Sequence, residues 1–222
     1  LTNETLKVNS ENGVLPGVSW PVRNVVITGM EAGLPIGYFR GYKTAGVFND
    51  NADIFGYIND EGDPIQPNAQ PGDLKFVDVN GDGQITTEDI TMIGKPWADM
   101  RLGLDINVVY KGFDMRALFA ASIGNDLYRI YERQDVPQAN MQTEWLDRWT
   151  PDNINAEYPR LSLGGENQVP SDFYVEDASF VRLRNFQIGY SLSTKGLETI
   201  QAKKLRIYIS MDNLLTFTKY TG

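Results

Sequence analysis

The feature that most constrains this 222-residue sequence is a two-residue alternation that runs from Met100 to Ala121. Successive side chains of a β-strand point to opposite faces, so this period places the apolar residues on one face. Lys111-Gly112 interrupts the pattern as a tight turn. The sequence therefore predicts a hairpin of two strands of roughly ten residues each, long enough to cross a membrane when tilted. Its apolar positions are Leu102, Leu104, Ile106, Val108 and Tyr110, then Phe113, Met115, Ala117, Phe119 and Ala121.

The alternation returns near the end of the sequence and predicts two more strands. A polar connector at residues 193–203 separates them, and its second half can form one or two helical turns. The apolar face carries Phe186, Ile188, Tyr190 and Leu192 on one strand, and Leu205, Ile207, Ile209 and Met211 on the other.

Two architectures fit these strands. A soluble sandwich buries the apolar face against a second sheet, whereas an outer-membrane barrel turns it to lipid and turns the polar face to a wet lumen. The pattern alone favours the sandwich, because soluble β domains are commoner. The strands are longer than the usual ~5–6 residues. The aromatic residues Tyr110, Phe113 and Tyr190 lie at strand ends, as in an interfacial girdle. Length and aromatic placement therefore favour the barrel.

Composition excludes several classes of function. The chain has no Cys and no His, which rules out Ser-His-Asp and Cys-His nucleophile systems and zinc sites built on those residues. A net charge of −9 with scattered basic residues argues against nucleic-acid binding. No run approaches the ~18 apolar residues of a membrane helix. The chain starts at Leu1 and stops in a strand-like stretch, so we expect a fragment of a longer protein.

The segment from Asp78 to Asp89 has the spacing of a calcium-binding loop. Side-chain oxygens of Asp78, Asn80 and Asp82 occupy the first, third and fifth positions, and Gly83 allows the sharp turn at the sixth. Gln84 ligates through its backbone carbonyl, and Asp89 takes the twelfth position, where sensor loops use Glu. An all-oxygen ligand set favours Ca²⁺, with Mg²⁺ as the alternative. The predicted metal ligands are therefore Asp78, Asn80, Asp82, Gln84 and Asp89.

The same residues have a simpler interpretation as a capped acidic turn. Thr86 can cap a short helix that begins near Thr87, with Asp89 three residues further on. The preceding residues 74–77 alternate like a strand and do not resemble an entering helix. Because only one such loop is present, we expect a structural ion that pins a surface loop, anchored by Ile85, with Glu88 facing solvent.

Several segments, in the same order along the chain, resemble the SusC/RagA-type TonB-dependent transporters of the bacterial outer membrane. Each is modest alone, and their ordered co-occurrence from Pro35 to the end is specific. They are residues 35–48 (PIGYFRGYKTAGVF), 72–83 (GDLKFVDVNGDG), 110–114 (YKGFD), 148–153 (RWTPDN), 158–160 (YPR), 176–185 (EDASFVRLRN) and 205–222 (LRIYISMDNLLTFTKYTG).

This resemblance implies an all-β fold of antiparallel strands from a large transmembrane barrel of about 22 strands with long outer loops. Residues 1–222 would be the C-terminal part of that barrel, with the calcium-type loop inserted at 78–89. The implied function is TonB-dependent import of glycans, oligosaccharides or peptides across the outer membrane with a SusD-like surface lipoprotein. The TonB complex would be contacted by a segment outside this chain, and the barrel would face outer-membrane lipid.

Two other classes of function remain as alternatives. One is a soluble, calcium-stabilised carbohydrate-binding or adhesion module in which Trp97, Trp145 and Trp149 stack on sugars; packing is the commoner role of such residues. The other is a glycosidase, which needs two facing carboxylates. Glu176 and Asp177 are neighbours on a strand and point to opposite faces, so we expect no enzyme. The sequence identifies neither the substrate nor the residues that contact it.

Overall fold

The computed structural model describes residues 14–20, 25–130, 140–162, 165–192 and 205–220. The chain forms two compact units. Unit 1 comprises residues 1–96 and 127–176, and unit 2 comprises residues 97–126 and 177–222. Among the described residues, no helix is both long and apolar enough to cross a membrane.

Strands dominate both units. The strands are β1 (Val14–Pro16), β2 (Ser19–Trp20), β3 (Val25–Val26), β4 (Thr28–Glu31), β5 (Tyr38–Gly41), β6 (Thr44–Val47), β7 (Leu74–Phe76), β8 (Thr91–Gly94), β9 (Met100–Tyr110), β10 (Phe113–Ile123), β11 (Asp126–Tyr128), β12 (Val175–Asp177), β13 (Phe180–Ser191) and β14 (Arg206–Thr218). The helices are α1 (Asn51–Gly56) and four 3₁₀ turns, η1 (Thr87–Asp89), η2 (Thr143–Asp147), η3 (Glu166–Gln168) and η4 (Asp172–Tyr174).

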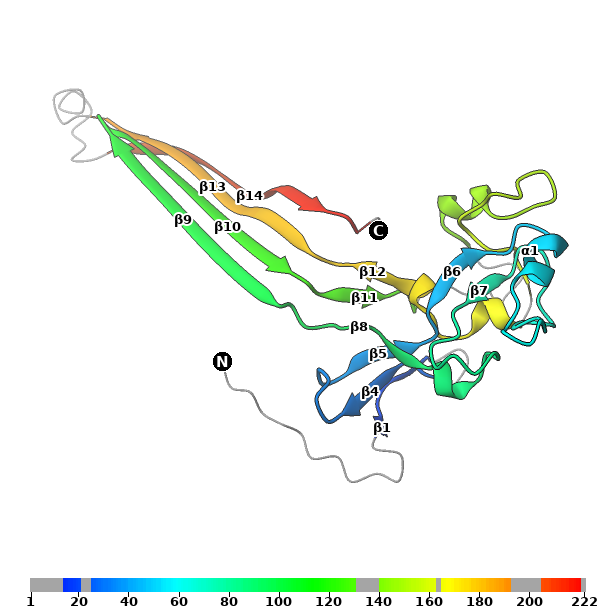
Figure 1. Ribbon diagram of the computed structural model, residues 1–222. Coiled ribbons are helices and arrows are strands. Elements are labelled where there is room, and N and C mark those ends of the chain that lie inside the picture. Colours follow the sequence, from blue (N-terminus) through cyan, green and yellow to red (C-terminus); the bar gives the residue numbers. More distant parts are fainter. Residues whose placement is uncertain (1–13, 21–24, 131–139, 163–164, 193–204, 221–222) are drawn as a thin grey trace. The chain divides into compact units, whose positions relative to one another are not determined.

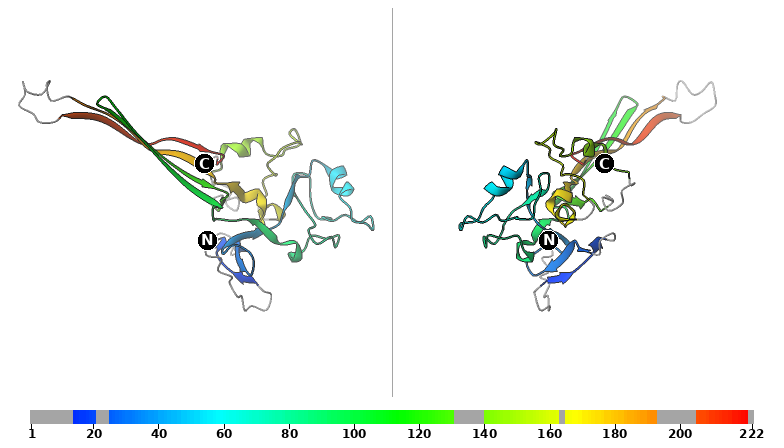
Figure 2. Two further views of the ribbon diagram at one scale, coloured as in Figure 1. Left: turned by 60° about the vertical axis from the view of Figure 1, so that its left-hand side comes forward. Right: turned by 90° about the vertical axis from the view of Figure 1, so that its right-hand side faces the viewer.

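Unit 2 is an antiparallel sheet in the order β14-β13-β10-β9. The four strands lie side by side in Figure 1, and Figure 2 shows them twisting together along their length. The predicted hairpin is confirmed: Phe113 pairs with Tyr110 across Lys111 and Gly112, which both have positive φ. That backbone matches the right-handed twist of the flanking strands. The predicted C-terminal strands are also present, as β13 and β14, whereas the connector 193–203 lies outside the described residues.

One face of this sheet is apolar and open. On β9 the side chains of Leu102, Leu104 and Val108 remain 53%, 57% and 47% exposed, and Ile207 and Ile209 of β14 are each 62% exposed. Within unit 2, the described residues supply no second sheet to cover them. Exposed apolar area on this scale is unusual for a protein surrounded by water. Phe113 and Tyr190 stack at the turn end of the sheet, with ring centroids 4.5 Å apart.

Extra residues in successive strands keep the apolar face continuous. Between the same two levels of the sheet, β10 runs from Ala117 to Phe119, β13 from Phe186 to Leu183, and β14 from Met211 to Leu215. Each strand is therefore one residue longer there than the one before it. These bulges switch the alternation so that Leu183 and Leu215 return to the face they would otherwise leave. In β14 the extra turn places Asn213 in the left-handed region, at φ 52°.

The opposite face carries charged pairs that join neighbouring strands. Arg116 of β10 binds Asp105 of β9, with Nη2 and Oδ2 2.7 Å apart. Arg206 of β14 pairs with Asp114 of β10 across the intervening strand β13. Gly189 of β13 makes this possible, since a Cβ there would lie 2.9 Å from side-chain atoms of both partners. The polar face thus holds an ion-pair ladder across the four strands.

Unit 1 has small sheets and two apolar clusters. Its main sheet has the order β1-β4-β5-β8, and β6 pairs with β7. One cluster gathers Ile27, Phe39, Tyr128 and Tyr174, and the other gathers Val47, Leu74 and Phe76. Phe173 packs against both clusters and so joins them. The predicted strands at residues 37–42 and 74–77 correspond to β5 and β7.

A buried polar network holds the long connections of unit 1 against β7. Arg160 donates two hydrogen bonds to the carboxylate of Asp73, at 2.6 and 3.3 Å. Asn167, 1% exposed, donates to the same carboxylate at 2.9 Å and accepts from the backbone N–H of Leu74 at 2.8 Å. Each buried polar group has partners, which offsets the cost of removing it from water. Residues 66–74 and 160–168 are therefore fixed relative to each other.

The left-handed residue at the β14 bulge gives a direct test of this register. Replacing Asn213 with Val should lower the free energy of unfolding by about 1–2 kcal/mol, because a β-branched residue is strained at positive φ. Asn213→Gly should cost little. Ile209→Val, at an exposed position of the same strand without positive φ, is the matched control. Denaturant unfolding measures all three, and equal stability of the Val and Gly variants at position 213 would contradict the bulge.

Candidate functional site

The loop predicted to bind calcium lies in unit 1 between β7 and η1. Ile85 packs against the cluster of Val47, Leu74 and Phe76, so the predicted anchor is confirmed. Gly81 and Gly83 have φ of 76° and 84°, which glycine adopts without strain. Gly83 is also required for space, because a Cβ there would lie 2.8 Å from the side chain of Asn59. The sharp turn is therefore fixed both by conformation and by packing.

The first three predicted ligands curl the loop through hydrogen bonds to its backbone. Asp78 accepts from the N–H groups of Gly81 and Gly83, both at 2.7 Å. The Asn80 side chain accepts from Asp82 at 3.0 Å, and the Asp82 side chain accepts from Gln84 at 2.9 Å. These side chains therefore fold back onto one turn and remain oxygen-rich, as a hard cation requires.

Asp89 closes the loop from its other end. It is fully buried, and it accepts from the N–H groups of Val79 at 2.8 Å, Asn80 at 3.3 Å and Thr86 at 2.8 Å. The Thr86 side chain accepts from Glu88 N–H at 3.2 Å, which completes a capping box with Asp89. The capped-turn interpretation is thus correct as a description of this end, and three donors satisfy the buried carboxylate.

The chemistry of the loop fits an oxygen-seeking cation, but the carboxylates are spread apart. Among the described residues, no group of three or more acidic side chains is close enough to hold a metal ion. Asp78, Asn80 and Asp82 lie together on the turn, Asp89 lies under it, and the Gln84 side chain is exposed. Glu88 is exposed, as expected.

An acidic turn that the sequence treats separately adjoins this loop. Asn59 organises the turn by accepting from the N–H groups of Glu61 and Asp63, at 3.1 and 2.9 Å. A cavity of about 380 Å³ lies between the two segments and is lined in part by Asp60, Glu61, Asp78 and Asp82. The close approach of Asn59 to Gly83 brings the turns together. No pattern in the sequence signals this tertiary contact.

The negative charge of the loop affects a nearby phenol. The hydroxyl of Tyr57 donates to the backbone oxygen of Phe76 at 2.8 Å. Burial raises the pKa of Tyr57 above its ordinary value, and the charges of Asp78 and Asp89 add to that rise. Tyr57 therefore reports on the field that a bound cation would reduce.

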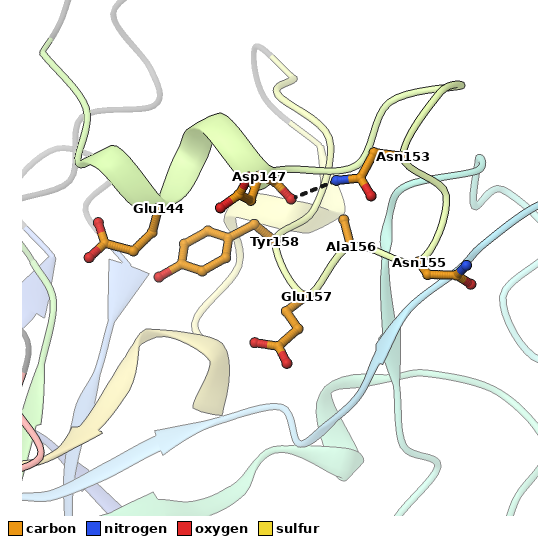
Figure 3. Close-up of a pocket in the computed structure, with 7 residues that line it drawn as sticks. All are labelled: Glu144, Asp147, Asn153, Asn155, Ala156, Glu157 and Tyr158. Carbon is orange, nitrogen blue, oxygen red and sulfur yellow. Dashed lines mark hydrogen bonds between the residues drawn. The ribbon is translucent and has the colours of Figure 1, made fainter.

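A second cavity, of about 440 Å³, lies beside η2 in unit 1 (Figure 3). Three carboxylates line it, those of Glu144, Asp147 and Glu157, together with Asn153, Asn155, Ala156 and Tyr158. In Figure 3 the side chains of Glu144, Tyr158 and Glu157 extend toward a common space. The sequence analysis did not single out these residues, because they come from a loop without regular periodicity.

The candidate sugar-stacking tryptophans of unit 1 have packing roles. Trp145 is 2% exposed and contacts the rings of Tyr158 and Phe173 edge-on. The indole N–H of Trp149 donates to the backbone oxygen of Asn49 at 3.0 Å. Trp97, in unit 2, is 56% exposed. Glu176 pairs with the buried Arg129 at 3.1 Å and has a structural partner instead of a second catalytic acid.

Comparison with known proteins places this fold among large outer-membrane importers. The structure of the RagAB peptide importer in the closed-closed state matches 97% of this chain and 22% of its own chain, with a TM-score of 0.66 and 22% identity. The RagAB peptide transporter structure matches 88% of this chain and 21% of its own, with a TM-score of 0.61 and 24% identity. No protein-family model matches the chain.

Curated relatives carry the relationship in sequence. TonB-dependent receptor P3 of Formosa agariphila is 35% identical over 195 residues, which are 87% of this chain and 19% of that protein. TonB-dependent receptor SusC of Bacteroides thetaiotaomicron is 32% identical over 157 residues, 70% of this chain and 15% of that protein. The chain thus spans less than a fifth of each of these two relatives. The resemblance to SusC/RagA-type TonB-dependent transporters is confirmed, and the chain is related to a segment of these receptors.

Proposed function

We propose that this chain forms part of an outer-membrane β-barrel that imports nutrients with energy from the TonB complex. The observation that carries the proposal is the open apolar face of β9, β10, β13 and β14. A strand of 11 residues such as β9 extends about 37 Å at ~3.4 Å per residue and, tilted by about 45°, reaches a height of about 26 Å. That matches the ~25 Å apolar band of such barrels.

The substrates and partners follow from the relatives and are part of the proposal. The relatives are named as TonB-dependent receptors, and the matched structures are of a peptide importer. We assign the parent protein to import of glycans, oligosaccharides or peptides together with a SusD-like surface lipoprotein. The barrel closes with strands outside this chain, which pair the free edges of β9 and β14. We assign no catalytic role.

Envelope fractionation of cells that express the full-length protein tests this proposal. We expect recovery with the outer membrane and a heat-dependent shift in gel migration, because a closed barrel resists detergent until it is boiled. Recovery in the soluble fraction, with unmodified migration, would instead support a soluble calcium-stabilised module.

We also propose that residues 78–89 bind a structural Ca²⁺ ion through Asp78, Asn80, Asp82, the Gln84 carbonyl and Asp89. The loop spacing, the positive φ of Gly81 and Gly83, and the inward carboxylates of Asp78 and Asp89 support this assignment. The ion would supply positive charge to a turn rich in carboxylates, and Ile85 would couple the stabilised turn to the core.

Calcium titration of the full-length protein tests the metal proposal. At a hundred times the dissociation constant, a ligand that binds only the folded state adds about 2.7 kcal/mol of stability. We expect Ca²⁺ to raise the unfolding temperature of the wild type and of Glu88→Gln, an exposed acid outside the ligand set. The Asp78→Asn, Asp82→Asn variant should lose the response. Absence of any Ca²⁺ response in the wild type refutes the proposal, and an equal response to Mg²⁺ would reassign the ion.

A further inference from the structure

Two cavities of opposite chemical character flank the single turn η2 of unit 1. The acidic cavity of Figure 3 contains Glu144 and Asp147 from this turn, and Glu157 from the loop that follows. A second cavity of about 320 Å³ is lined by Trp145 and Leu146 of the same turn, and by Arg148 directly after it. Alternate residues of η2 and its C-cap thus serve different cavities.

The acidic cavity offers hydrogen-bond acceptors and negative charge. Among the residues that the structure describes, no basic side chain lines it or pairs with its three carboxylates. The Asn153 amide spends its N–H groups on the backbone oxygens of Asp147 and Arg148, at 3.1 and 3.3 Å. The described carboxylates do not converge closely enough for one metal ion. The cavity therefore suits an extended organic cation, such as an ammonium or guanidinium group on a stem.

The second cavity offers donors within an apolar wall. Met141, Leu146 and Leu161 line it and are 37%, 74% and 43% exposed. Trp145 also lines it, is 2% exposed, and has an indole N–H with no hydrogen-bond partner in the structure. A buried donor without a partner costs about 1–3 kcal/mol, so this N–H is an unexplained group in the cavity wall.

Arg148 adds positive charge to this second cavity. Its guanidinium donates to the backbone oxygen of Trp145 at 3.1 Å, and no described acidic side chain forms an ion pair with it. The remaining N–H groups of the guanidinium fork match the two oxygens of a carboxylate. The apolar wall beside it suits an aliphatic side chain.

We propose that these two cavities together bind a short peptide that ends in an aliphatic residue with a free carboxylate and carries a basic residue before it. Opposite sides of a helical turn are roughly 10 Å apart, about three residues of extended chain. The carboxylate binds at Arg148, the aliphatic side chain lies against Met141 and Leu146, and the basic side chain enters the acidic cavity. A neutral glycan would leave both sets of charges without partners.

This inference rests on the proposed import function only for its biological role, because it names the class of molecule imported. Binding is measured on the full-length protein in detergent by isothermal titration calorimetry. The probe is N-acetyl-Lys-Gly-Leu with a free carboxylate. The comparison ligands are N-acetyl-Gln-Gly-Leu, the C-terminal amide of the probe, and the neutral trisaccharide maltotriose. Losing either charge should weaken binding about tenfold or more, and the trisaccharide should bind more weakly than the probe.

The variants separate the two cavities. Arg148→Gln should lose the preference for the free carboxylate and keep the preference for Lys, whereas Glu144→Gln combined with Glu157→Gln should do the reverse. The retained preference shows that each variant is folded. Lys43→Gln and Asp152→Asn, exposed charges that line neither cavity, should bind as the wild type does.

Three outcomes overturn the peptide proposal: no binding of the probe, equal binding of all three peptides, or tighter binding of the trisaccharide. Any of these in a protein that still fractionates with the outer membrane would refute the peptide site and leave the import proposal intact. A soluble protein that binds the probe would do the opposite.

Discussion

The structure of unit 2 depends on one constraint, which is that each long strand must keep its apolar residues on a single face while pairing every backbone group with its neighbours. Side chains alternate with a period of two, so a shift of one residue would move every apolar side chain to the polar face. The added residues of β13 and β14 meet this constraint by returning Leu183 and Leu215 to the apolar face. On the other face, Gly189 leaves room for the ion pair between Asp114 and Arg206. Both devices serve a sheet whose two faces meet different surroundings.

Unit 1 has a different kind of order. Its regular elements are short, and its loops are held by side chains such as Asp73, Arg160 and Asn167 and by the aromatic contacts of Phe173. Such a scaffold positions loops rigidly without a large core, and binding residues are commonly carried on loops supported in this way. The acidic turn at Asn59, the loop at residues 78–89 and the cavities beside η2 all belong to it. Unit 1 therefore provides the polar chemistry of the chain, and unit 2 provides the long apolar strands.

Local patterns predicted much of this architecture, and contacts distant in sequence account for most of what they missed. The alternation at Leu102 to Tyr110 and the turn at Lys111-Gly112 are local signals, so the hairpin was predictable almost to the residue. The capped turn at Thr86 was predictable for the same reason. The bulge at Asn213 was not, because it depends on register with β13. The contact of Asn59 with Gly83 and the cavities around η2 depend on tertiary packing, which no spacing in the sequence encodes.

The central claim is that the two faces of the long sheet meet lipid and water, and single cysteines along β9 test it most directly. The chain contains no cysteine, so each substitution introduces one reactive group into it. In outer-membrane vesicles, a water-soluble maleimide should label cysteines at Gly103, Asp105 and Asn107 and should spare those at Leu102, Leu104 and Ile106. Alternating protection with this phase would support a membrane-spanning strand. Uniform labelling, or protection of the polar positions instead, would contradict the account.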